Sequence, residues 1–101
     1  MILSIDTAKK NFQVTRAPEP KLDQHGEQRT EKASGAPLWL TEVVVTDESG
    51  GEIVRITTPG EAPKVDVHDT VEVVDLVAKP WMDQRRSGVS FKAAAVLLAK
   101  D

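Results

Sequence analysis

The side chains of this sequence that could catalyse a reaction or hold a metal are few and far apart. His25 and His68 are the two histidines, and each lies in a different predicted turn without a Glu-x-x-His or serine-elbow pattern around it. There is no cysteine, so neither a thiolate metal site nor a disulfide framework can form. The carboxylates lack a spacing that pairs them for acid–base chemistry, and the glycines form no phosphate-binding loop. The sequence therefore predicts a protein that is not an enzyme and that uses no metal or cofactor.

Tryptophan and arginine occur together in a way that suits binding of a nucleic-acid strand. Proteins that bind single strands combine a cationic groove with aromatic rings on which bases stack, each stacked base contributing about 1–3 kcal/mol. Trp81 follows Pro80 in a stretch, 79–88, that we expect to be a polar loop carrying Arg85 and Arg86. Its indole would serve either as a stacking platform or as a lid over one end of a barrel.

Other candidates lie on predicted strands. Trp39 either faces solvent beside Arg55 or belongs to the core. Phe91 is expected in the core, so the neighbouring Lys92 would point the opposite way, toward solvent or a groove. The candidate nucleic-acid-binding residues are therefore Trp39, Arg55, Trp81, Arg85, Arg86 and Lys92.

The charge of the chain limits this hypothesis without removing it. A formal net charge of −3 argues against a strongly basic nucleic-acid binder. The local arrangement of charge, however, governs contact with phosphate. Cations gather near two predicted loops, with Lys9, Lys10 and Arg16 before the first and Arg85 and Arg86 in the last. Acids concentrate in a predicted turn with Asp47, Glu48 and Glu52, and again around Asp66 and Asp69.

A β-hairpin between residues 35 and 58 organises the predicted fold. Two runs rich in β-branched residues flank a Ser-Gly-Gly sequence at 49–51, which is typical of a hairpin. The continuous apolar run at 43–45 indicates burial on both sides of the sheet, as in a closed or nearly closed barrel.

Further strands complete an all-β domain that spans residues 1–101. We expect a long first strand over 2–16, interrupted near 7–11, a returning strand over about 70–79 and a last strand over 89–98. A helix from about Ala93 onward is the alternative for the last segment. Together with the hairpin these make five strands, which predicts an OB-fold-like, partly open barrel. An SH3-like small barrel is the alternative.

A long polar segment separates the first strand from the hairpin. Residues 17–35 are rich in charged and polar side chains and cannot bury enough apolar surface to offset their ordering entropy. They are expected to form a flexible loop between strands 1 and 2, or a two-stranded arm that turns at His25 and Gly26.

Nothing in the sequence suggests a membrane protein. No apolar run approaches the roughly 18 residues that a membrane-spanning helix needs. The first residues lack the basic start and long apolar centre of a signal peptide, so a cytoplasmic location is expected.

Several segments carry a family resemblance. They are Gly35-Ala-Pro-Leu-Trp39, the strand pair after it, the Val71–Leu76 strand, Pro80-Trp81 and Arg86-Ser-Gly-Val-Ser-Phe-Lys92. In these segments the chain resembles small proteins of actinobacterial plasmids and integrative elements. It is also similar in outline to OB-fold single-stranded-DNA-binding proteins of phages and plasmids, including the helix-destabilising proteins of filamentous phages. The resemblance covers most of residues 35–96 and leaves 17–34 unaccounted for. The chain differs from these proteins in its net negative charge and its lack of tyrosine.

The resemblance implies binding of single-stranded DNA, or of RNA, without catalysis and largely without sequence preference, during replication or transfer of mobile DNA. An unpaired edge strand would offer a route to a homodimer. The alternative hypothesis is an acidic β-barrel that docks onto a replication or transfer protein, which the net charge and the acidic 47–52 turn favour.

Overall fold

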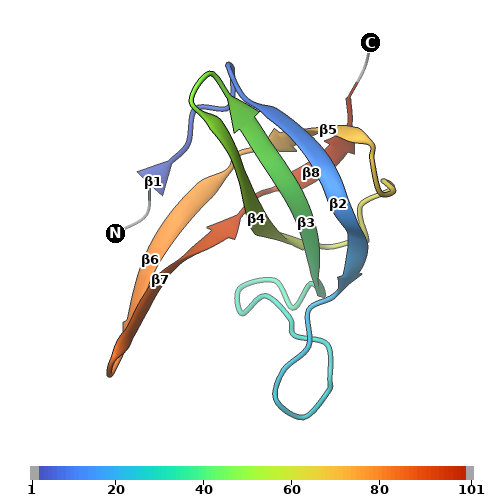
Figure 1. The fold of residues 1–101 in the computed structure, drawn as a ribbon. Coiled ribbons are helices and arrows are strands. Elements are labelled where there is room, and N and C mark those ends of the chain that lie inside the picture. Colours follow the sequence, from blue (N-terminus) through green and yellow to red (C-terminus); the bar gives the residue numbers. More distant parts are fainter. Residues whose placement is uncertain (1–2, 100–101) are drawn as a thin grey trace.

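The computed structural model describes residues 3–99 and shows an all-β protein (Figure 1). Eight strands form one sheet in the order β1-β6-β7-β4-β3-β2-β5-β8. The strands are β1 (Leu3–Ser4), β2 (Asn11–Pro20), β3 (Leu38–Asp47), β4 (Gly50–Pro59), β5 (Thr70–Val74), β6 (Val77–Asp83), β7 (Arg86–Lys92) and β8 (Ala95–Leu98). The sheet is open and curls strongly into a half-barrel around the core. This part of the chain contains no helix, and therefore none that could span a membrane.

The predicted hairpin is confirmed as β3 and β4. Ten consecutive residue pairs join these strands, from Leu38 opposite Pro59 to Asp47 opposite Gly50. The chain reverses through Glu48 and Ser49. Gly50 follows with a φ of 133°, a backbone angle that residues other than glycine rarely adopt. The β-branched residues of both strands favour this extended pairing.

The core lies on the inner face of the curled sheet. Side chains alternate between the two faces of each strand, and the inner positions of β2, β3 and β4 are among the most buried in the protein. The buried cluster contains Phe12, Val14, Val43, Val54, Ile56, Val65, Val71, Val73, Leu76, Ala93 and Val96. It draws on β2, β3, β4, β5 and β8, so burial of this face holds strands distant in the sequence together.

The prediction of five strands is wrong because the expected strands are interrupted. Asp75, with a φ of 53°, and Leu76 separate β5 from β6, and a left-handed residue breaks the pairing ladder. Ala93 and Ala94 separate β7 from β8, because the chain changes its partner strand here. The amide of Ala93 donates to the Thr57 carbonyl of β4, and the amide of Ala94 donates to the Val74 carbonyl of β5. The alternative helix from about Ala93 does not form, because β8 pairs with β5 instead.

The first strand is also divided. The sequence predicts one strand over 2–16 with an interruption near 7–11. The structure has β1 and β2 with residues 5–10 between them; Ile2 lies outside the described residues.

The segment expected to be a polar loop at 79–88 is a β-hairpin. β6 and β7 pair from Val77 opposite Lys92 to Asp83 opposite Arg86, and Trp81 therefore lies on a strand. Gln84 takes a φ of 47° in the turn. Beyond the barrel this hairpin projects as a two-stranded arm, which we call the β6–β7 arm (Figure 1).

The long polar segment between β2 and β3 is shorter than predicted, because residues 17–20 belong to β2. The remaining residues, 21–37, are called the 21–37 loop. They fold back on themselves through isolated bridges between Leu22 and Gln28 and between Thr30 and Pro37. The reversal occurs at Gly26, with a φ of 82°, where the sequence predicts a turn.

Two hydroxyl groups on the inner face generate a prediction about stability. Oγ1 of Thr41 and Oγ1 of Thr58 are buried and find no hydrogen-bond partner within residues 3–99. An unsatisfied buried polar group costs about 1–3 kcal/mol, and valine has nearly the same shape as threonine. We expect Thr41→Val and Thr58→Val each to raise the free energy of unfolding by about 0.5–2 kcal/mol, measured by urea denaturation.

Thr57→Val is the matched control for this experiment. The Thr57 hydroxyl is also buried, but it accepts a hydrogen bond of 3.0 Å from Nζ of Lys21. Its replacement should therefore leave stability unchanged or lower it. A loss of stability in Thr41→Val and Thr58→Val equal to that of the control would contradict the prediction.

Candidate nucleic-acid interface

The outer face of the sheet brings three of the predicted residues onto one surface. Thr57 of β4 lies opposite Lys92 of β7 in a parallel pairing, so Arg55, two residues before Thr57, shares that face with Lys92. On the other strand of the arm, Trp81 lies opposite Gly88, which is four residues before Lys92 and thus on the same face. Arg55, Trp81 and Lys92 come from three strands, and the outward side of the curled sheet presents all of them.

A groove opens where β7 separates from β4. The two strands pair at Ile56–Phe91 and at Thr57–Lys92, and the part of β7 that precedes Phe91 leads away from β4 in the arm. The groove is wide open to solvent and has a volume of about 450 Å³. Its lining combines side chains of β3, β4, β7 and the 21–37 loop: Lys21, Leu40, Glu42, Ile53, Val54, Arg55, Thr57, Val89, Ser90 and Phe91.

Arg55 is held beside the groove by an acid on the neighbouring strand. Its side chain is 61% exposed, and its Nε lies 3.3 Å from Oε2 of Glu42. The other carboxylate oxygen of Glu42 accepts a hydrogen bond of 3.0 Å from the Thr15 hydroxyl. The guanidinium group therefore keeps most of its surface open to solvent while the carboxylate fixes its position.

Trp81 is an open aromatic surface with one side supported. The indole is 42% exposed. A Cβ placed on Gly88 would come within 2.7 Å of Cζ2 and 2.9 Å of Cε2 of the ring, so the indole packs closely against the glycine backbone. Such cross-strand packing of an aromatic ring on glycine stabilises a two-stranded ribbon. The exposed part of the ring remains available for stacking.

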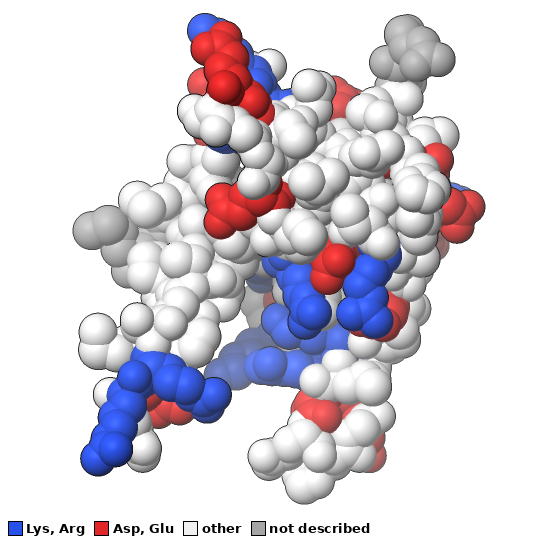
Figure 2. All heavy atoms as spheres, viewed as in Figure 1, with Lys and Arg blue, Asp and Glu red and all other residues white. Residues whose placement is uncertain are grey.

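Several cations and one acid, Asp83, lie near this indole on the arm. Alternation along the paired strands places Lys79 and Arg86 on the same face as Trp81. Arg85 occupies the turn at the end of the arm. Within residues 3–99 neither Arg85 nor Arg86 forms an ion pair. Figure 2 shows Lys and Arg at the end of the arm, and again between the arm and the 21–37 loop.

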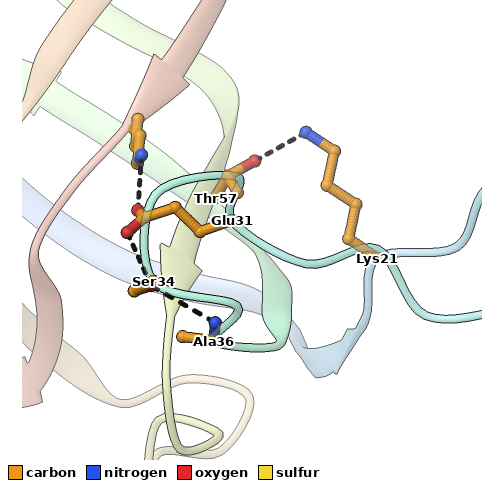
Figure 3. Close-up of polar contacts among 6 residues, drawn as sticks. Lys21, Glu31, Ser34, Ala36 and Thr57 are labelled. Atoms are coloured by element: carbon orange, nitrogen blue, oxygen red, sulfur yellow. Dashed lines mark hydrogen bonds and ion pairs between the residues drawn. The ribbon is translucent and has the colours of Figure 1, made fainter.

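The cationic group between the arm and the loop contains two residues that the sequence analysis missed, Lys21 and Arg29. The backbone amide of Arg29 donates to the Lys21 carbonyl at 2.7 Å, so both residues lie side by side at the base of the loop. Nζ of Lys21 reaches the Thr57 hydroxyl at 3.0 Å (Figure 3). Thr57 is in turn the residue paired with Lys92. Counting outward from the predicted turn at His25 and Gly26 pairs Lys21 with Thr30, one residue away from its actual partner, so the sequence signal was only approximate.

Burial and positive neighbours act together on Lys21. Desolvation lowers the pKa of Lys21, and the charges of Arg29 and Lys92 lower it further. Repulsion from nearby cations disfavours the protonated amine. A negatively charged group placed between these side chains would offset the repulsion among them.

Trp39 is not part of this surface. It lies opposite Thr58, next to Thr41 on the inner face, while Arg55 faces outward. Its indole nitrogen donates a hydrogen bond of 2.7 Å to the Gly60 carbonyl. The ring is half-buried and fastens the end of β3 to the segment after β4, so its position suits a structural role.

One acidic cluster lies away from the groove. The turn between β3 and β4 carries Asp47, Glu48 and Glu52, at the end of β3 opposite to Leu40. Nζ of Lys10 lies 2.9 Å from Oδ2 of Asp47 and is the main reason for the lowered pKa of that carboxyl. Lys10 is thus committed to the acidic turn, and the net negative charge does not spread evenly over the protein.

The described part of the chain contains no group of three or more histidine, aspartate or glutamate side chains arranged to hold an ion.

The contact between Trp81 and Gly88 yields a prediction. Gly88→Ala places a methyl group where the indole now packs, so the ring must move. We expect a shifted tryptophan emission spectrum and a loss of about 1–3 kcal/mol in the free energy of unfolding. Ser90→Ala, on the same face of the same strand, should change neither. The prediction is wrong if Gly88→Ala alters the spectrum equally when Trp81 has been replaced by phenylalanine.

The ion pair between Glu31 and Lys92 yields a prediction about pH. A hydrogen bond from Lys92 is the main cause of the lowered pKa of Glu31, and the Ser34 hydroxyl contributes next. A carboxyl whose pKa is lower in the folded state stabilises that state at higher pH, and loses this contribution as pH falls through the lowered value. In Lys92→Gln the pKa of Glu31, followed by carbon NMR of the carboxyl, should rise toward that of an unpaired glutamate. An unchanged value would contradict the proposed cause.

The sequence matches no protein-family model, and neither curated proteins nor solved structures match the chain.

Proposed function

We propose that this protein is a variant of the five-stranded OB-fold barrel and that it binds single-stranded DNA without catalysis. The pairing pattern supports the fold. β2, β3 and β4 follow one another as a meander, and β5 returns to pair with β2, which is the order of a Greek key. β5 and β6 can be counted as one interrupted strand, and so can β7 and β8. Together with β2, β3 and β4 they make five long strands, and β1 is a short additional strand.

The candidate interface occupies the place at which OB folds bind oligonucleotides. That place is the face of the second and third strands, flanked by the loop between strands 1 and 2 and the loop between strands 4 and 5. In this protein the corresponding parts are the outer face of β3 and β4, the 21–37 loop and the β6–β7 arm. The groove is lined by residues of all three parts.

One observation supports the function above the others: an exposed indole shares one face of the arm with three cations and a single acid, Asp83. Trp81 presents an open ring surface, and Lys79, Arg86 and Lys92 share its face. A base can stack on a ring only when it is free of its duplex partner, so this arrangement suits a single strand. Ring stacking and phosphate contacts carry little sequence information, which predicts weak base preference.

The biological setting follows the family resemblance. Replication or transfer of mobile DNA is the process in which a small protein of this kind would cover exposed single strands. RNA offers the same bases and phosphates, and parallel titrations with DNA and RNA oligonucleotides of one sequence would rank the two.

A fluorescence titration with oligothymidylate tests the function. We expect quenching of tryptophan emission on binding, and a loss of affinity of about 5- to 100-fold in Trp81→Ala, because one stacked base contributes about 1–3 kcal/mol. Trp39→Phe should retain the affinity, since that ring faces the core. Absence of binding at low salt would overturn the proposal.

The same titration at rising salt separates this function from its alternative. Phosphate binding should weaken with a slope of about −0.7 in log–log form for each contacted phosphate, and Arg86→Ala should make the slope shallower. Lys64→Ala, an exposed cation in the segment after β4, is the matched control. An acidic module that docks onto another protein, the alternative that the Asp47–Glu52 turn favours, would leave wild-type DNA binding undetectable.

A further inference from the structure

The carboxylate of Glu31 lies among the cations of the candidate interface. Its Oε2 is 2.8 Å from Nζ of Lys92, and its Oε1 accepts a hydrogen bond of 2.9 Å from the Ser34 hydroxyl (Figure 3). Lys92 belongs to β7, whereas Glu31 belongs to the 21–37 loop. Glu31 of the loop therefore forms an ion pair with Lys92, the lysine of the arm that would contact phosphate.

Lys21 and Arg29 complete a cluster of three cations around this contact. Lys21 is fixed by its hydrogen bond to Thr57, which is the residue paired with Lys92. The backbone bond between Arg29 and Lys21 places the two residues side by side, and the charges of Arg29 and Lys92 both act on the Lys21 amine. Three positive charges thus converge from the loop and β7, and the carboxylate of Glu31 is the acid that contacts them through Lys92.

We propose that Lys21, Arg29 and Lys92 form a phosphate subsite, and that Glu31 occupies it in the free protein until a phosphodiester of the bound strand displaces the carboxylate. This inference rests on the proposed function, because it assigns a regulated step to the same surface. A phosphodiester carries the same single negative charge as a carboxylate and offers oxygens that lysine and arginine can bind.

The geometry makes the carboxylate displaceable. The ion pair is partly open to solvent, with side-chain exposures of 50% for Lys92 and 25% for Glu31. Pairs of this kind contribute about 0–1 kcal/mol, so the loss of the pair opposes binding only slightly. Glu31 also resides on a loop, where its own backbone is held by the bonds to Ala36 and Gly35 rather than by the sheet.

Two consequences distinguish an occupied subsite from an open one. First, removal of the carboxylate frees Lys92, so Glu31→Gln should bind oligothymidylate about two- to fivefold more tightly at low salt. Second, a carboxylate displaced in the wild type stays beside the strand and offsets one of the positive charges that neutralise its phosphates. Glu31→Gln removes this offset, so one more condensed cation leaves the strand and the salt slope should steepen by about 0.7.

Glu27→Gln is the matched control. Glu27 lies on the same loop and its replacement changes the net charge equally, but its side chain makes no hydrogen bond or ion pair within the described residues. We expect it to shift affinity less than Glu31→Gln and to leave the salt slope unchanged. In a Lys92→Gln background Glu31→Gln should lose its advantage over the control, since the two residues act as a pair.

The outcomes separate this inference from the function on which it rests. Wild-type binding with equal affinities and slopes for Glu31→Gln and Glu27→Gln would overturn the subsite and leave the function standing. Binding by none of the variants would overturn both. A tighter and more salt-sensitive Glu31→Gln, with both effects abolished by Lys92→Gln, supports the displacement of the carboxylate.

Discussion

The parallel contact between β4 and β7 is the constraint on which the shape of this protein depends. It joins Ile56 to Phe91 and Thr57 to Lys92, and the amide of Ala93 adds a bond to the Thr57 carbonyl. Phe91 packs against the core at this point, which holds one end of β7 in place. Because the pairing goes no further, β6 and β7 leave the barrel as an arm, and the groove opens along β4.

The alternation of side chains along paired strands turns this shape into two chemically different faces. The inner face is filled by aliphatic residues and Phe12, with Trp39 closing one end through its bond to Gly60. The outer face carries Arg55, Lys92 and the supported indole of Trp81. A one-residue change of register would exchange these faces, so the long, regular pairing of β3 with β4 protects the interface as well as the core.

Partial separation of charge explains how a protein of net charge −3 presents a group of cations. The acidic turn between β3 and β4 lies at one end of the hairpin, whereas the cations of the arm and of the base of the 21–37 loop lie at the other, where that loop also carries acids (Figure 2). Interactions between exposed charges fade over about 8–10 Å at ordinary ionic strength. Screening at this range leaves a bound strand under the influence of the local cations and weakens repulsion from the acidic turn.

The sequence by itself determined the all-β class, the β3–β4 hairpin and the exposed position of Arg85 and Arg86, since β-branched runs, glycine turns and charge are local properties. Only the tertiary structure decided that Trp81 lies on a strand against Gly88 and that Trp39 faces inward. Likewise it alone joined Lys21 and Glu31 to β4 and β7, because such contacts link residues 36 and 61 positions apart. Long-range pairing depends on how the whole sheet curls to bury its core, and no short stretch of sequence carries that information.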